Sequence, residues 1–266
     1  MEINLNKSEY VKEQYVNNEK LSVRYRLHDI YSTNKQGFLP WLFEQMAFTE
    51  NCSILELGCG DARIWENNIE RLPRGCRLVL SDFSQGMADA ARDKFKAENM
   101  DFRVIDICSI PYEDDTFDII LANHMLYHVP DLDRAITEVK RVLKPDGRFY
   151  AGTGGDNGMP KFLSGVVRTV SPGFDPDYTI FPGFTAFSLQ SGGALLGKYF
   201  DDVKRVDYVD SLEVTVTKDL MDWLGTVFDF GKHSVDYDLL YDHFEKIRLR
   251  DGFIKVPKEV GVFVCG

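Results

Sequence analysis

A short apolar run that ends in two closely spaced glycines constrains the fold of this chain most. The residues are Ser53–Ala62, SILELGCGDA. The apolar part, Ile54–Leu57, predicts a buried strand, while Gly58 and Gly60 predict a tight turn in which a ligand can approach bare backbone. Asp61 is expected to cap a helix over the following residues, DARIWENNIERL. A strand, a glycine turn and a helix together open a doubly wound nucleotide-binding sheet.

Two residues around this turn indicate which ligand it binds. A dinucleotide fingerprint requires a third glycine for close helix packing beside a pyrophosphate, and Arg63 occupies that position. Glu56, two residues before the first glycine, would repel a phosphate and attract a cation. S-adenosylmethionine carries an ammonium and a sulfonium and no phosphate. The turn is therefore predicted to bind this cofactor rather than a nicotinamide dinucleotide.

Further motifs follow the turn in order. They are the strand Arg77–Ser81 ending at Asp82, the strand Phe102–Ile105 ending at Asp106, FDIILANHMLYHVPD from Phe117, and LKPDG from Leu143. Together with LELGCG, this series resembles the class I S-adenosylmethionine-dependent methyltransferases, in particular the small-molecule, type 11-like family. The resemblance covers roughly residues 50–153. It implies an α/β fold with a doubly wound, mostly parallel, seven-stranded Rossmann-like sheet whose last strand is antiparallel.

The resemblance also implies which residues hold the cofactor. Asp82 lies about 20 residues beyond the glycines, where a carboxylate binds ribose hydroxyls; a simple helix cap is the alternative. In the family an acidic residue at Asp106 binds the adenine amino group and the next backbone N–H meets a ring nitrogen, although Asp106 could instead stabilise a loop turn. The predicted cofactor-binding set is Glu56, Gly58, Cys59, Gly60, Asp82, Phe83, Ser84, Met87, Asp106, Ile107, Asn123 and Tyr15.

Two histidines follow the fourth predicted strand. His124 and His128 are four residues apart, which on a helix would place them on one face. If the methyl acceptor must lose a proton, His128 is the first candidate for the catalytic base and His124 the second. Packing or capping roles are the alternative for both. No third ligand follows at a suitable spacing, so we predict no metal site.

Composition excludes several classes of partner. A net charge of −11 argues against binding to nucleic acid, which relies on basic patches. The five cysteines lack CxxC spacing and are expected to be free thiols in a reducing cytoplasm. We find no apolar leader and no long uncharged apolar run, so a cytoplasmic protein without a membrane partner is expected. Oligomeric state is not indicated.

The N-terminal part is expected to divide in two. Residues 1–36 are predicted to form a helical lid over the cofactor, with Tyr15, Arg24 and His28 as possible contacts. A helical arm that only packs against the sheet is the alternative. Residues 37–153 are predicted to form the cofactor-binding core.

The C-terminal part is expected to border the acceptor. Residues 154–252 are predicted to be a substrate-side insertion, with a helix over 186–199, strand six over Val203–Val216, and further helices over 217–228 and 235–250. Residues 253–266 are predicted to close the core, with Phe253–Val256 and Gly261–Cys265 paired as a hairpin.

The predicted activity is transfer of a methyl group from S-adenosylmethionine to a small-molecule acceptor by in-line displacement, leaving S-adenosylhomocysteine. Such a reaction depends mainly on holding the acceptor close and collinear in a dry site. A non-catalytic S-adenosylmethionine-binding protein is one alternative. A nicotinamide-dependent oxidoreductase is another, although Arg63 and Glu56 argue against it.

Overall fold

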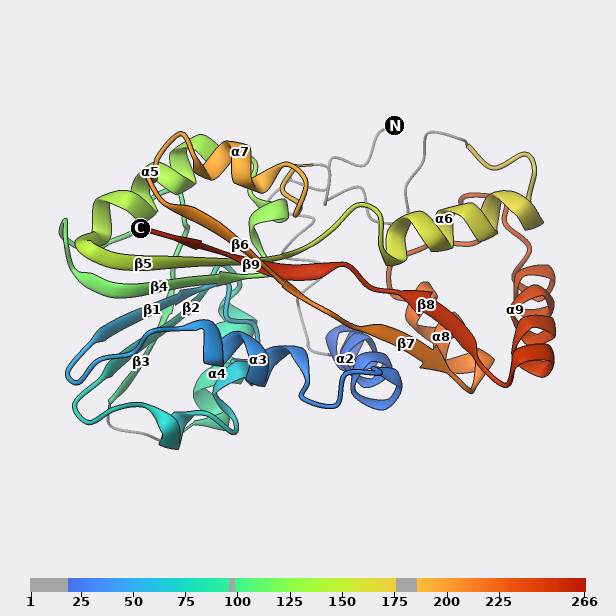
Figure 1. The fold of residues 1–266 in the computed structure, drawn as a ribbon, viewed down its shortest axis with the longest axis horizontal. Helices are drawn as coiled ribbons and strands as arrows, with labels where there is room; N and C mark the ends of the chain where they lie inside the picture. Colours follow the sequence, from blue (N-terminus) through green and yellow to red (C-terminus); the bar gives the residue numbers. More distant parts are fainter. Residues whose placement is uncertain (1–18, 96–98, 176–185) are drawn as a thin grey trace.

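A seven-stranded sheet forms the centre of the molecule (Figure 1). The computed structural model describes residues 19–95, 99–175 and 186–266. The strand order is β3-β2-β1-β4-β5-β9-β6, and β9 runs antiparallel to both of its neighbours while β1 to β5 are mutually parallel. The strands are β1 (Ser53–Leu57), β2 (Arg77–Asp82), β3 (Met100–Val104), β4 (Phe117–Asn123), β5 (Leu143–Gly154), β6 (Val203–Tyr208) and β9 (Val260–Cys265). This arrangement confirms the predicted sheet.

Helices cover both faces of this sheet, which explains why its central strands are apolar throughout. Strand β4, FDIILAN, is buried along most of its length, as expected for a central strand of a parallel sheet. Helices α5 (Leu132–Val142) and α7 (Gly192–Leu196) lie on one face. Helices α3 (Phe38–Gln45) and α4 (Gln85–Lys94) lie on the other.

A smaller unit lies beyond one end of the sheet (Figure 1). Its two-stranded sheet pairs β7 (Ser211–Val214) with β8 (Ile254–Pro257). Four helices pack around these strands: α2 (Glu19–Tyr31), α6 (Met159–Val170), α8 (Thr217–Gly225) and α9 (Tyr237–Asp251). Their buried side chains form a separate core. None of the described helices has the length and apolar character needed to cross a membrane.

Two antiparallel chain segments run from the large sheet into the small one and form a ribbon. Each segment is interrupted once between the two sheets. Tyr208 of β6 is opposite Val260 of β9, and Ser211 of β7 is opposite Pro257 of β8. The interruptions are therefore at Val209–Asp210 and Lys258–Glu259, and together they are called the ribbon break. The predicted single strand over Val203–Val216 was wrong, because the chain leaves one sheet for the other at Asp210. The predicted C-terminal hairpin was also wrong, because β8 pairs with β7 while β9 pairs with β5 and β6.

Another prediction fails directly after the glycine turn. Instead of one α-helix, the chain forms two 3₁₀ turns, η1 (Arg63–Trp65) and η2 (Ile69–Arg71). Ala62 adopts a left-handed conformation, φ 58°, so Asp61 does not begin a helix. The Asn68 amide donates to the Ile64 carbonyl at 2.7 Å, which occupies the acceptor that an α-helical N–H would use.

The helix predicted over 186–199 is much shorter than expected. Only α7, Gly192–Leu196, is α-helical. The Ser188 hydroxyl accepts hydrogen bonds from the backbone N–H groups of Gln190 (3.2 Å) and Ser191 (3.3 Å). Such local side-chain bonds favour a turn over a helix.

Candidate functional site

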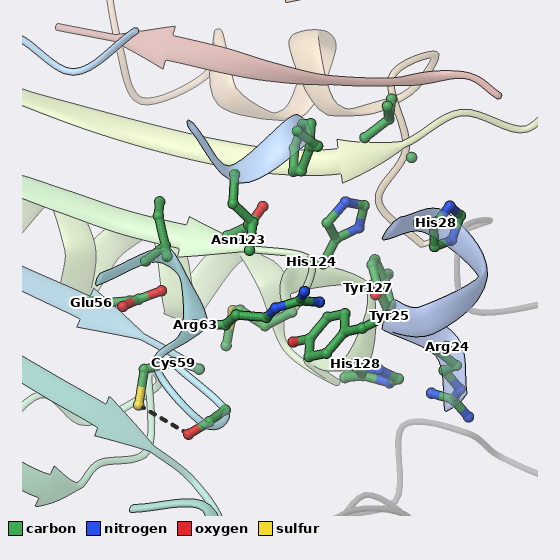
Figure 2. Close-up of a pocket in the computed structure, with 18 of the residues that line it drawn as sticks. Arg24, Tyr25, His28, Glu56, Cys59, Arg63, Asn123, His124, Tyr127 and His128 are labelled. Carbon is green, nitrogen blue, oxygen red and sulfur yellow. Dashed lines mark hydrogen bonds between the residues drawn. The ribbon is translucent and has the colours of Figure 1, made fainter. Parts of the chain in front are cut away.

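A cavity of about 700 Å³ opens at the carboxyl ends of the parallel strands, where ligands bind in open α/β sheets. In Figure 2, Glu56 and Cys59 lie at the strand ends, the α2 residues Arg24, Tyr25 and His28 lie opposite, and Arg63 and His124 lie between. The predicted residues that line it are Glu56, Gly58, Cys59, Gly60, Asp82, Phe83, Asp106, Ile107, Asn123, His124 and His128. Ser84 and Met87, also predicted to bind the cofactor, do not line it. Tyr15 lies outside the described residues.

The glycine turn forms the floor of the cavity. Gly58 has φ +68°, and a Cβ atom there would lie 2.7 Å from the Met125 Cβ atom, so only glycine fits. The Cys59 N–H donates to the Ser81 carbonyl at 2.8 Å, and the Gly60 N–H donates to the Asp82 carboxylate at 3.0 Å. The turn is therefore held to the end of β2.

Three carboxylates lie at the ends of consecutive strands. Glu56 on β1 is only 3% exposed and accepts a hydrogen bond from the Trp65 indole at 2.6 Å. Asp82 ends β2 and also accepts from the Ser84 N–H at 2.8 Å. Asp106 follows β3, is exposed, and accepts from the Cys108 N–H at 2.9 Å.

Burial perturbs two of these carboxylates. It raises the pKa of Glu56 to about 8, with a further contribution from the negative charge of Asp82. Burial also raises the pKa of Asp82. Buried acids without a cationic partner favour a positively charged ligand and disfavour a phosphate. The residues at this end of the cavity therefore fit the ammonium and ribose of S-adenosylmethionine.

The segment after β4 forms the next wall. His124 has φ +53° and donates its backbone N–H to the Gly152 carbonyl at 2.8 Å. His128 ends a 3₁₀ turn, η3 (Leu126–His128), so the two histidines do not share one face of an α-helix. Burial lowers the pKa of both imidazoles to about 4, and both are therefore neutral near pH 7. The buried Asn123 Oδ1 has no hydrogen-bond partner among the described residues.

Helix α2 closes the cavity opposite the strand ends. The Arg63 guanidinium lies 2.5 Å from the Asp29 carboxylate and 4.4 Å from the centre of the Tyr25 ring. Arg24 donates to the Thr226 hydroxyl at 3.0 Å and to its carbonyl at 2.9 Å. Burial lowers the pKa of His28, on the same helix, to about 3. Helix α2 is thus connected to the glycine turn on one side and to the end of α8 on the other.

Several lining residues were not predicted. They come from α2, α6, α8 and the ribbon break, and include Tyr25, Asp29, Met159, Trp223 and Lys258. None belongs to a recognisable motif, and only the fold brings them together. Arg63 was noticed only as a replacement for glycine, although its contact with α2 is its main role in the fold.

Comparison with known proteins agrees with this geometry. Residues 55–151 match the methyltransferase domain family. Residues 55–151 form a class I S-adenosylmethionine-dependent methyltransferase domain. The matched region of this methyltransferase runs from β1 to β5 and contains the glycine turn, the three carboxylates and both histidines of the β4 segment.

Two curated relatives and one solved structure show how far the similarity extends. A demethylmenaquinone methyltransferase of Lactobacillus johnsonii is 24% identical over 73% of this chain and 75% of its own length. The methyltransferase GfsG of Streptomyces halstedii is 32% identical over 41% of this chain, and the match spans only 40% of that relative. The crystal structure of the [4+2]-cyclase SpnF covers 97% of this chain and 95% of its own, with a TM-score of 0.59 and 18% identity. That last likeness concerns the fold alone.

Proposed function

We propose that this methyltransferase transfers a methyl group from S-adenosylmethionine to a small-molecule acceptor bound in the same cavity. One observation carries the proposal. A single cavity of about 700 Å³ holds the three carboxylates at one end and the histidines, Met159 and Trp223 at the other. This volume is typical of small-molecule sites. A relative named as a demethylmenaquinone methyltransferase, which is 24% identical, supports a small acceptor.

In this proposal the carboxylates hold the cofactor, which supplies an electrophilic methyl group when bound. Glu56 pairs with the ammonium, and this attraction offsets the free-energy cost of burying the Glu56 charge. Asp82 accepts from the ribose hydroxyls, oriented by its bonds to the Gly60 and Ser84 N–H groups. Asp106 accepts from the adenine amino group, the Ile107 N–H donates to the ring, and Asn123 lies beside the methionine end.

The histidines would accept a proton from the acceptor where it has one to lose. A base must be unprotonated to act, and the lowered pKa of His128, about 4, keeps it so at neutral pH. The same holds for His124. Residues of helix α2 and Trp223 line the cavity, where they would limit the access of water and so favour close approach of the reactants.

Calorimetry with S-adenosylhomocysteine tests the cofactor assignment. We expect binding to the wild type and binding at least tenfold weaker for Asp82→Asn, because the amide cannot accept from both ribose hydroxyls and the turn. Asp101→Asn, one strand away and paired with Arg103 on the surface, is the matched control and should bind normally. Binding of a nicotinamide dinucleotide without binding of S-adenosylhomocysteine would overturn the proposal.

Turnover is tested separately. Wild-type protein with methyl-labelled S-adenosylmethionine and a metabolite extract should yield a labelled small molecule, and Asp82→Asn should yield much less. Tight cofactor binding with no labelled product from any extract would instead identify a non-catalytic binding protein.

A further inference from the structure

The ribbon break places an ion pair at the acceptor end of the cavity. Lys258 and Asp210 come from opposite strands of the break, and their side chains form a salt bridge. The Lys258 side chain is 10% exposed and lines the cavity, whereas the Asp210 side chain is fully buried behind it. Lys258 therefore borders the ligand space, and Asp210 does not.

Asp210 is held rigidly by five donors. Besides Lys258, they are the hydroxyls of Ser32 (2.8 Å) and Thr33 (3.1 Å) and the N–H groups of Asn34 (2.9 Å) and Ser211 (2.8 Å). Although burial alone raises the pKa of Asp210, the hydrogen bond from Lys258 and the other bonds hold it below its usual value. A carboxylate that already accepts hydrogen bonds from so many donors has little capacity left to accept another from a ligand, and it fixes the position of the lysine.

The Lys258 ammonium retains one donor for a ligand. Two of its N–H groups bind Asp210 and Ser32, the latter at 3.2 Å. An ammonium has three N–H groups, and the third has no hydrogen-bond partner among the described residues. The groups that face it from other elements are the neutral imidazoles of His28 and His124, the Tyr208 ring, whose centre is 5.7 Å from Nζ, and the Asp29 carboxylate. Burial lowers the pKa of Lys258, and the negative charges of Asp210 and Asp29 oppose that effect.

Charge is distributed unevenly along the cavity. Three acids, Glu56, Asp82 and Asp106, line the cavity at the strand ends. At the acceptor end, Arg24 binds a neutral partner, Thr226, and Lys258 presents its free donor. The acids there are already occupied, because Asp29 pairs with Arg63 and Glu259 accepts from Gln190 at 2.7 Å. A cation would meet repulsion at this end, and an anion would meet donors.

We propose that the Lys258 ammonium binds an anionic oxygen of the methyl acceptor, either a carboxylate or an ionised phenol or enol hydroxyl. This inference rests on the proposed methyl transfer. A charge-assisted hydrogen bond from a lysine whose position is already fixed binds an oxyanion more strongly than a neutral carbonyl. The same contact lowers the pKa of a bound hydroxyl and so makes it a better nucleophile.

Matched pairs of probes test the proposal without knowledge of the natural acceptor. Benzoate is compared with benzamide, and 4-nitrophenol with 4-nitroanisole, by calorimetry on protein saturated with S-adenosylhomocysteine. We expect the wild type to bind at least one anion tenfold or more tightly than its neutral partner. The pair that shows the preference identifies the anionic group as a carboxylate or a phenolate. Because 4-nitrophenol absorbs visible light only when ionised, its apparent pKa when bound is a second readout, expected to fall.

Variants separate binding from stability. Lys258→Met should abolish both the preference for the anion and the shift in the probe's pKa. Because this change leaves Asp210 buried without its cation, the double variant Lys258→Met/Asp210→Asn provides a form without an unpaired charge. Lys255→Met removes an exposed lysine of β8, three residues before Lys258, and should keep both effects.

The outcomes are distinguishable from failure of the proposed function. Normal binding of S-adenosylhomocysteine together with equal affinity for charged and neutral probes would overturn the role of Lys258 and leave the cofactor assignment intact. An anion preference that persists in the folded double variant would also overturn it. Loss of S-adenosylhomocysteine binding in the wild type would instead refute the proposed function itself.

Discussion

The buried Glu56 carboxylate should make the stability of this methyltransferase fall as pH rises. Burial raises its pKa from 4.5 to about 8 in the folded protein. Between pH 5 and 7.5 an unfolded chain has released this proton while the folded chain still holds it. The folded state therefore binds more protons, and the free energy of unfolding decreases with pH.

The magnitude follows from the size of the shift. Each pH unit in this window removes at most about 1.4 kcal/mol, so two and a half units correspond to about 3 kcal/mol. Glu56→Gln keeps an oxygen that can accept from the Trp65 indole but has no proton to lose. We expect the variant to match the wild type near pH 5 and to be about 3 kcal/mol more stable at pH 7.5. It should also bind S-adenosylhomocysteine at least tenfold more weakly, because the ammonium loses its partner.

Urea denaturation at several pH values between 5 and 7.5 measures this difference. The control is Glu44→Gln, which removes the same charge from a half-exposed glutamate that pairs with Arg71. Its stability should follow the wild-type dependence on pH. If the free energies of unfolding of the wild type and Glu56→Gln changed with pH in parallel, the reasoning would be refuted. Such a result would show that Glu56 titrates alike in the folded and unfolded states.

Two further substitutions and one pH dependence have defined outcomes. Gly58→Ala should destabilise the fold by about 1–2 kcal/mol in urea denaturation, because φ is +68° and the new Cβ atom meets a packed side chain, whereas Gly165→Ala, where a Cβ meets nothing, should be neutral or stabilising. Arg63→Ala should lower the free energy of unfolding by under about 1 kcal/mol, because its ion pair is partly exposed. It should nevertheless speed amide hydrogen exchange in α2. Arg71→Ala, which loses a similar ion pair and ring contact elsewhere, should leave α2 unchanged. If His128 is the base, the rate should decline only towards its pKa of about 4, and a decline centred near pH 6.5 would contradict that role.

The strand ends were predictable because the parallel half of the sheet follows regular rules. Apolar runs marked β1, β2 and β4, and parallel strands end on one edge, so Glu56, Asp82 and Asp106 had to meet there. Local chemistry was harder to anticipate. The Asn68 side chain diverts the chain from an α-helix after the glycine turn, an effect that helical periodicity does not reveal.

The acceptor end could not be predicted from the sequence for a different reason. Asp210 interrupts a strand because its partners, Ser32 and Lys258, are distant in the chain and reach it only in the folded state. Alternation of apolar residues over Val203–Val216 carried no sign of that break. Arg24 and His28 were anticipated as possible contacts, but their placement depends on the packing of α2 against α8, which no local pattern encodes.

The position of β9 has a consequence for biosynthesis. This strand is inserted between β5 and β6, although residues 260–265 are translated after both. Until they leave the ribosome, β5 keeps an open edge and β6 has no neighbour in the large sheet. A nascent chain paused before residue 260 therefore exposes hydrogen-bonding edges that invite aggregation. Premature termination there should give an insoluble fragment rather than a smaller working enzyme.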